Sequence, residues 1–96
     1  MSDIKLPTEY TKLTPAERRL VREQYITQQE GKCMYCNNLL LENPTMEVMN
    51  KAINWDLFPL GFRLYPIHLQ HCHKTDMTEG AVHMKCNAVL WQYYKR

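Results

Sequence analysis

Histidine and cysteine residues concentrate in one stretch of this chain. All four histidines and two of the four cysteines lie between residues 68 and 87. The other two cysteines, Cys33 and Cys36, form a C-x2-C pair upstream. A matching H-x2-C pair lies downstream, and two pairs at this spacing supply the nitrogen and sulfur ligands of a tetrahedral zinc site. We therefore expect one structural Zn²⁺, bound by Cys33, Cys36, His83 and Cys86.

Two alternatives to this ligand set are open. Cys72 could replace His83 as a ligand, but it has no close partner at the spacing of a zinc knuckle. We therefore interpret Cys72 as a buried free thiol, since free cysteine is among the most buried residue types. In the second alternative the four residues are unrelated, and Cys33 and Cys36 are small buried thiols.

Two further histidines, His71 and His73, lie two residues apart. In a strand they would point to one face together with Leu69. One histidine on a strand is more often structural than catalytic. Two on one face, beside a zinc site and followed by Asn87, favour a catalytic role. A neutral histidine, with a reference pKa near ~6.5, can take a proton from water at pH 7.

The order of these motifs resembles a known family. A C-x2-C pair, the segment His-Leu-Gln-His-Cys-His, a glycine-containing turn and a ligand pair ending in Cys-Asn-Ala resemble the His-Asn-His nucleases. The most similar group is the phage recombination endonuclease VII family. The resemblance covers about residues 15–93 and is specific over 31–37 and 68–88. It implies a small α+β domain, the ββα-metal motif, in which a two-stranded hairpin and a helix stand beside zinc.

The resemblance also implies a role for each site residue. His71 takes the place of the general base, and His73 that of a second histidine that assists at the phosphate. Asn87 takes the place of an amide that binds a catalytic Mg²⁺ or Mn²⁺. Gln70 stands where the family usually has a metal-binding aspartate, and a neutral amide is a weaker ligand for a hard cation. The implied partner is DNA, and the implied setting is the cytoplasm of a phage-infected bacterial cell.

Basic residues form a second candidate site. Thr14-Pro15-Ala16-Glu17 predicts a helix start with a capping box, and the helix should run to about Gln29. Leu13, Ala16, Leu20 and Val21 should form its buried side. The opposite side is either solvated or a phosphate-binding surface. The candidate contacts with DNA are Arg18, Arg19, Arg22, Lys74 and Lys85.

The 96 residues are sufficient for one domain, which we place at 13–96 after a flexible arm at 1–12. A short helix is predicted at 45–53, and a loop followed by a strand at 55–69, with Phe62 and Leu64 in the strand. Residues 74–80 should form the turn between two strands, and a helix should begin near His83.

Composition excludes several classes of protein. Hydrophobic residues make up 45% of the chain, so it is not disordered by composition. No window approaches ~18 consecutive apolar residues, and the N-terminus has no apolar signal core, so we expect an intracellular protein without a membrane span. The net charge of +2 says little about a polyanionic partner.

Three functions are compatible with these patterns. We favour a metal-dependent DNA endonuclease or nickase. The alternatives are a catalytically degenerate nuclease fold that binds only DNA or a protein, and an unrelated zinc knuckle that mediates protein contacts. Gln70 and Cys72 favour the degenerate fold. The oligomeric state is open, and a homodimer is one option.

Overall fold

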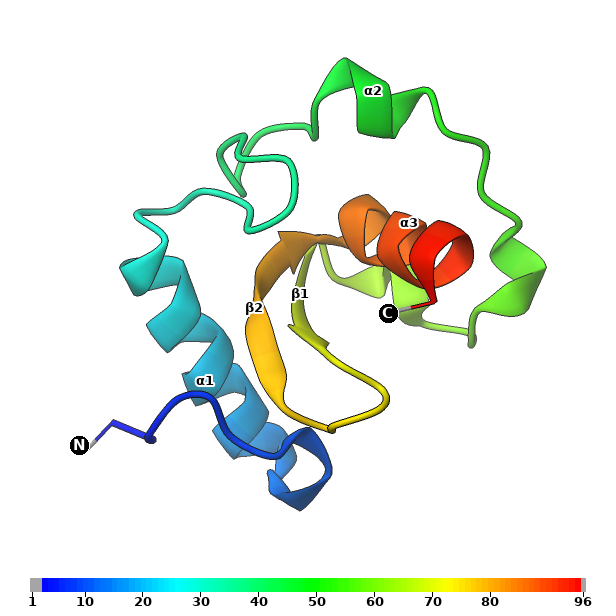
Figure 1. The fold of residues 1–96 in the computed structure, drawn as a ribbon. Helices are drawn as coiled ribbons and strands as arrows, with labels where there is room; N and C mark the ends of the chain where they lie inside the picture. Colours follow the sequence, from blue (N-terminus) through cyan, green and yellow to red (C-terminus); the bar gives the residue numbers. More distant parts are fainter. Residues whose placement is uncertain (1–2, 96) are drawn as a thin grey trace.

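The structure, a computed structural model, describes residues 3–95. A two-stranded hairpin lies between a long N-terminal helix and the C-terminal helix (Figure 1). The long segment that joins the N-terminal helix to the hairpin arcs over the end of the hairpin at which the second strand meets the C-terminal helix. This is the expected α+β architecture. The elements are α1 (Pro15–Gln28), α2 (Met46–Met49), β1 (Ile67–His71), β2 (Thr78–His83) and α3 (Met84–Tyr94), with three-residue 3₁₀ helices at Tyr10–Lys12, Trp55–Leu57 and Phe62–Leu64. No helix within residues 3–95 has the length and apolar content to cross a membrane.

The hairpin is antiparallel and contains one irregularity. Ile67 pairs with His83 at one end and His71 pairs with Thr78 at the other, with a register shift between Gln70 and His71. Strand β1 ends at His71. The expectation that His71 and His73 share a face of one strand is therefore wrong, since His73 lies in the turn that follows.

The first helix forms as its sequence predicts. The Thr14 side chain accepts a hydrogen bond from the Glu17 amide, and the Glu17 side chain accepts one from the Thr14 amide. These bonds satisfy two backbone donors that a helix start leaves free. The buried residues of α1 are Val21 and Tyr25, and Tyr25 Oη lies 2.9 Å from Thr78 Oγ1. Ala16, which we expected on this buried side, is exposed.

The end of α1 approaches β2 closely at Gly80. A Cβ atom there would lie 2.7 Å from Gln29 Oε1 and 2.9 Å from Met34 Sδ, well inside contact distance. The Gln29 side chain occupies this space because it accepts a hydrogen bond from the Ala81 amide and donates one to the Ala81 carbonyl. Only glycine, which has no Cβ, leaves room for this contact. Gly80 lies in β2 and not in the predicted turn.

Other differences from the sequence expectations lie in the connecting segments. The predicted helix at 45–53 is only Met46–Met49. Phe62 and Leu64 belong to a 3₁₀ helix instead of a strand, because Gly61 takes a left-handed conformation with φ of 91° that interrupts an extended chain. α3 begins at Met84 and buries Cys86, Ala88, Val89 and Leu90.

The arm predicted at 1–12 packs on the hairpin over the part that the structure describes. The Thr8 carbonyl accepts a hydrogen bond from the Thr78 amide at 2.8 Å, and the Tyr10 amide donates to the Asp76 carbonyl at 2.7 Å. Residues 1 and 2 lie outside the described residues. The chain therefore reaches the hairpin turn before α1 begins, and the predicted flexible arm pairs with the hairpin at Thr8 and Tyr10.

Candidate functional site

The four predicted zinc ligands come together at the end of the hairpin where β2 meets α3. Cys33 and Cys36 lie on the loop after α1, His83 is the last residue of β2 and Cys86 lies in the first turn of α3. Their ligand atoms all lie within 4.8 Å of one another, and this is the one such group of three or more among residues 3–95. The cluster is largely buried.

The distances within this cluster fit zinc. His83 Nδ1 lies 3.4 Å from Cys36 Sγ and 3.6 Å from Cys86 Sγ. Tetrahedral zinc with Zn–S near ~2.3 Å and Zn–N of ~2.0–2.1 Å separates nitrogen and sulfur ligands by about 3.5 Å. The cluster therefore has the dimensions of a Cys₃His structural zinc site.

Hydrogen bonds around the cluster also suit a cation. His83 Nε2 lies 2.9 Å from the Leu39 carbonyl and 2.8 Å from the Glu42 carbonyl, so Nε2 carries the proton and Nδ1 presents its lone pair. A hydrogen bond from Cys86 lowers the pKa of the Cys33 thiol to about 4, against the opposing effect of burial. The same hydrogen bond and burial raise the pKa of Cys86, so Cys86 holds the proton of this pair, which zinc binding would release.

Cys72 has no part in this cluster. It lies in the hairpin turn, is half-buried and has no disulfide partner. The expectation of a free thiol is confirmed, but the thiol is less buried than we expected. His83, and not Cys72, supplies the fourth ligand position.

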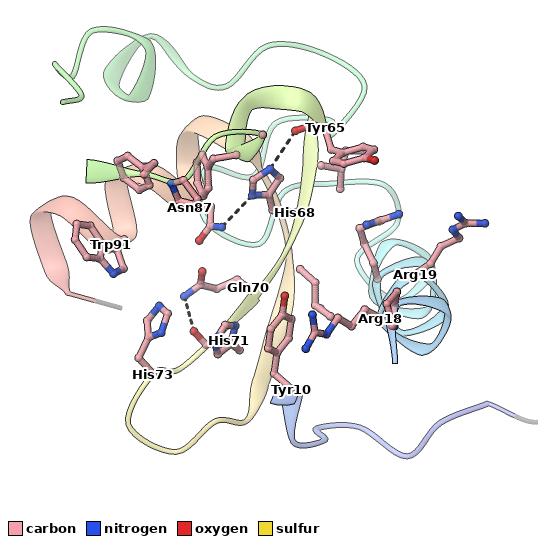
Figure 2. Close-up of a pocket in the computed structure, with 18 of the residues that line it drawn as sticks. Tyr10, Arg18, Arg19, Tyr65, His68, Gln70, His71, His73, Asn87 and Trp91 are labelled. Carbon is pink, nitrogen blue, oxygen red and sulfur yellow. Dashed lines mark hydrogen bonds between the residues drawn. The ribbon is translucent and has the colours of Figure 1, made fainter. Parts of the chain in front are cut away.

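A cleft of about 710 Å³ lies alongside β1. The N-terminal arm, α1, the segment after residue 55, β1 and α3 all contribute side chains to it (Figure 2). It brings together His71, His73, Gln70 and Asn87, the residues for which the family resemblance implies catalytic and metal-binding roles. No aspartate or glutamate of the described residues lines it.

The orientation of Asn87 is fixed by His68. Nε2 of His68 lies 3.1 Å from the Tyr65 carbonyl, which can only accept, so Nε2 carries the proton. Burial lowers the pKa of His68, which keeps the ring neutral and leaves Nδ1 as an acceptor. Nδ1 lies 3.1 Å from Asn87 Nδ2, which therefore donates to it. The side-chain oxygen of Asn87 is left facing the cleft.

Gln70 is held in a comparable way. Its side chain is 2% exposed, and Nε2 donates to the His71 carbonyl at 3.1 Å and to Glu79 Oε1 at 3.4 Å. The side-chain oxygens of Gln70 and Asn87 point toward one another (Figure 2). Amide oxygens are among the ligands that hard divalent cations accept.

His71 lies in a row of rings. Its imidazole stacks on Tyr10 with ring centroids 3.9 Å apart and planes 7° apart. The guanidinium of Arg18 lies over the Tyr10 ring, 4.2 Å from its centroid. Tyr10 belongs to the arm that we placed outside the domain. His73 meets His71 edge to face at 4.6 Å. The two histidines are therefore neighbours although His73 is not on the strand.

The surroundings of His71 keep it neutral. Burial lowers its pKa from the ordinary value of 6.5, and nearby His73 and Arg18 lower it further, against Asp76 and Glu79. An imidazole with a lowered pKa is unprotonated at pH 7 and can accept a proton.

The basic residues of α1 and those of the hairpin region lie in different places. Arg18, Arg19 and Arg22 line the cleft, and none of their guanidinium groups forms a hydrogen bond or ion pair with a protein acceptor within residues 3–95. Lys85 donates to the Met49 carbonyl at 2.6 Å, beside α2. Lys74 is exposed in the turn. Neither lysine lines the cleft.

Two site residues were not recognised in the sequence. His68 lies two residues before Gln70, and this spacing on one strand face is a signal that could have identified it. Tyr10 has no such signal, because it reaches His71 through contacts between distant parts of the chain. Comparison with protein-family models, curated proteins and solved structures found no match to this chain.

Proposed function

We propose that this protein is a metal-dependent DNA endonuclease or nickase that hydrolyses phosphodiester bonds at the cleft. The observation that carries the proposal is the pair of amide oxygens, on Gln70 and Asn87, oriented toward each other beside neutral His71. The resemblance to His-Asn-His nucleases, which implies the same residues, supports it.

Each residue has a part in this proposal. His71 takes the proton from the attacking water, since its ring is neutral, lines the cleft and follows Gln70 directly in β1. Tyr10 and His73 restrict its ring through their contacts. Arg18, Arg19 and Arg22 bind the phosphate backbone. Gln70 and Asn87 would hold Mg²⁺ or Mn²⁺ through their side-chain oxygens, and the bound cation would supply charge stabilisation at the scissile phosphate.

The deciding experiment is plasmid nicking by zinc-loaded protein with Mg²⁺ or Mn²⁺. His71→Ala should lower the rate by about 10²–10⁴-fold, since that is the usual contribution of a general base. Zinc content and the folded state should be retained. The control is Leu41→Ala, which alters a side chain that is 93% exposed and does not line the cleft. Absence of cleavage by the wild-type protein would favour the degenerate fold, which binds DNA or a protein without cutting.

A further inference from the structure

Three aromatic side chains form one side of the cleft. Phe58 and Phe62 come from the segment after residue 55, and Trp91 comes from α3. We call these three residues the aromatic wall. The ring centroid of Phe58 lies 4.6 Å from that of Phe62 and 5.4 Å from that of Trp91. Trp91 is four residues after Asn87, which places it one turn further along the same face of α3.

The aromatic wall is only partly covered by the protein. All three residues are half-buried, whereas Val82 and Val89 in the core have no exposed surface. The segment that carries Phe58 and Phe62 also exposes Leu60 and Leu64, at 104% and 74%. Large apolar side chains in this segment therefore lie at a surface beside the cleft instead of filling a core.

The opposite side of the cleft is positively charged. Figure 2 shows Trp91 and the two arginines Arg18 and Arg19 on opposite sides of Gln70 and Asn87. The arginines have no acidic partner within residues 3–95, and no carboxylate lines the cleft. An occupant that suits both sides carries negative charge along one edge and flat apolar faces along the other.

We propose that the aromatic wall is a stacking subsite for an unpaired nucleobase, so that the cleft takes single-stranded DNA in preference to a duplex. A single strand presents phosphates and base faces at the same time, and bases stack on aromatic side chains. A duplex keeps its base faces inside the helix and must first unstack a base, at a cost in free energy. This inference rests on the proposed function for its choice of DNA as the ligand.

The experiment measures binding and does not depend on cleavage. A fluorescein-labelled oligonucleotide is titrated with zinc-loaded protein, as a single strand and as the matching duplex, without added Mg²⁺ or Mn²⁺. The single strand should bind more tightly. Phe58→Leu keeps an apolar side chain but removes the ring, and it should weaken single-strand binding by about fivefold or more.

The matched control is Tyr94→Leu, which removes an exposed ring on α3 that does not line the cleft. It should bind the single strand as the wild-type protein does. Because Phe58→Leu could affect folding, a second measurement uses unaltered protein. An abasic site is moved along the oligonucleotide, and one position should weaken binding much more than its neighbours.

Two results would overturn the inference: duplex binding as tight as single-strand binding, or an abasic scan without a sensitive position. The outcomes also separate the two proposals. Single-strand preference without any cleavage removes the proposed function and leaves the stacking subsite. Cleavage by a protein that prefers the duplex removes the subsite and leaves the endonuclease.

Discussion

The two sites of this domain share one hairpin but are assembled differently. At the end where β2 meets α3, four ligands come from two short segments, each pair three residues apart. Beside β1, the cleft takes side chains from the arm, α1, the segment after residue 55, the strand and α3. Local spacing determines the first site, and contacts between distant segments determine the second. The zinc cluster should therefore respond to mutation as one unit, whereas the cleft should respond residue by residue.

The largest effect is expected at the zinc cluster, where loss of one ligand should remove the whole site. Cys36→Ser should remove zinc and cooperative folding together, because zinc binding of about 10–16 kcal/mol is as large as the whole stability of a typical domain, about 5–15 kcal/mol. Zinc content and thermal unfolding are the measurements. Cys72→Ser makes the same change outside the cluster and should leave both intact. If Cys36→Ser keeps its zinc, or Cys72→Ser loses it, the assignment of ligands is wrong.

An intermediate effect is expected at Gln70. In Gln70→Glu a carboxylate oxygen replaces the side-chain nitrogen that donates to the His71 carbonyl and to Glu79. Three hydrogen-bond acceptors then face one another in a buried site. Without Mg²⁺ it should destabilise the protein by about 1–3 kcal/mol, and Mg²⁺ should restore much of that loss. The melting temperature without Mg²⁺ measures the destabilisation, and the melting temperature with Mg²⁺ measures the recovery.

The control for this change is Gln24→Glu. The Gln24 amide is also hydrogen-bonded to backbone, as a donor to the Ile4 carbonyl and as an acceptor from the Ile4 amide. It should lose stability without recovering in Mg²⁺. Recovery of both variants, or of neither, argues against a cation site at Gln70.

A smaller effect is expected at Tyr10. Tyr10→Ala removes the ring that stacks on His71 and should lower kcat for cleavage by about 2- to 10-fold, the range that an aromatic pair of ~0.5–1.5 kcal/mol allows. Tyr10→Phe keeps the ring and should retain the rate. NMR provides a readout independent of activity, because the imidazole protons of His71 should lose their ring-current shift only in Tyr10→Ala. Identical behaviour of the two variants would exclude a role for the stack.

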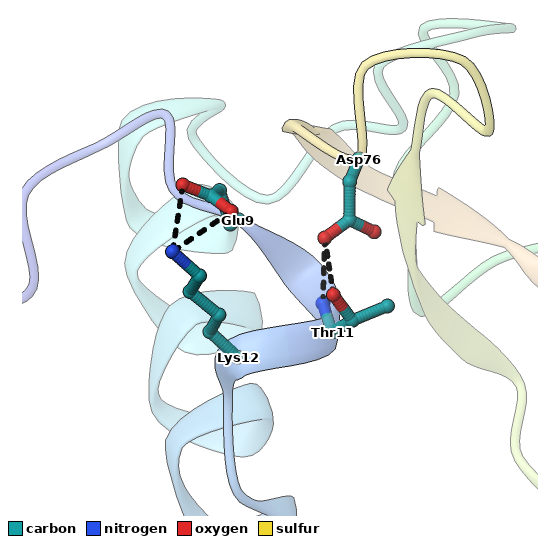
Figure 3. A network of polar contacts seen from close by, with 4 residues as sticks. All are labelled: Glu9, Thr11, Lys12 and Asp76. Atoms are coloured by element: carbon teal, nitrogen blue, oxygen red, sulfur yellow. Dashed lines mark hydrogen bonds and ion pairs between the residues drawn. The ribbon is translucent and has the colours of Figure 1, made fainter.

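The smallest effect concerns the attachment of the arm. Asp76 Oδ2 accepts hydrogen bonds from the Thr11 amide at 3.0 Å and the Thr11 hydroxyl at 2.6 Å (Figure 3). Asp76→Asn weakens this contact and should reduce hydrogen-exchange protection of the Tyr10 amide. Glu9→Gln breaks only the exposed ion pair with Lys12 and should change nothing, since such pairs contribute little.

The pH dependence of this attachment follows from the carboxylate. The Thr11 hydrogen bonds lower the pKa of Asp76 below its ordinary value of 3.8. Its contribution is therefore fully present above that value and is lost only as the pH falls through the lower folded pKa. The difference in protection between wild-type and Asp76→Asn should be equal at about pH 5.5 and pH 7. A difference that already shrinks at the lower pH would show that another group holds the arm.

The sequence was informative where structure depends on neighbouring residues. The capping box at Thr14, the zinc ligand pairs and the hairpin followed by a helix were all predicted, because short spacings determine them. Neither the register shift after Gln70 nor the end of β1 at His71, before His73, was predicted. Residues 55–66 were harder, since apolar residues there suggest a strand while the left-handed Gly61 interrupts it.

The contact between Tyr10 and His71 shows the other limit. It depends on backbone pairing between the arm and the hairpin turn, more than 60 residues apart in sequence. No periodicity in either segment encodes that pairing. The sequence therefore identified His71 as a candidate base but did not identify Tyr10 as the ring that stacks on it.

The hydrogen bonds of His68 connect two properties of the cleft. The Tyr65 carbonyl selects the ring tautomer, and the tautomer selects which atom of Asn87 faces the cleft. Tyr65 belongs to the same segment as Phe58 and Phe62, so a ligand that shifts this segment also alters the donor set available to a cation. Linkage then requires the reverse: a cation that favours one orientation of Asn87 must bias the segment by the same free energy. On the proposed function we therefore expect binding at the two halves of the cleft to be coupled through His68.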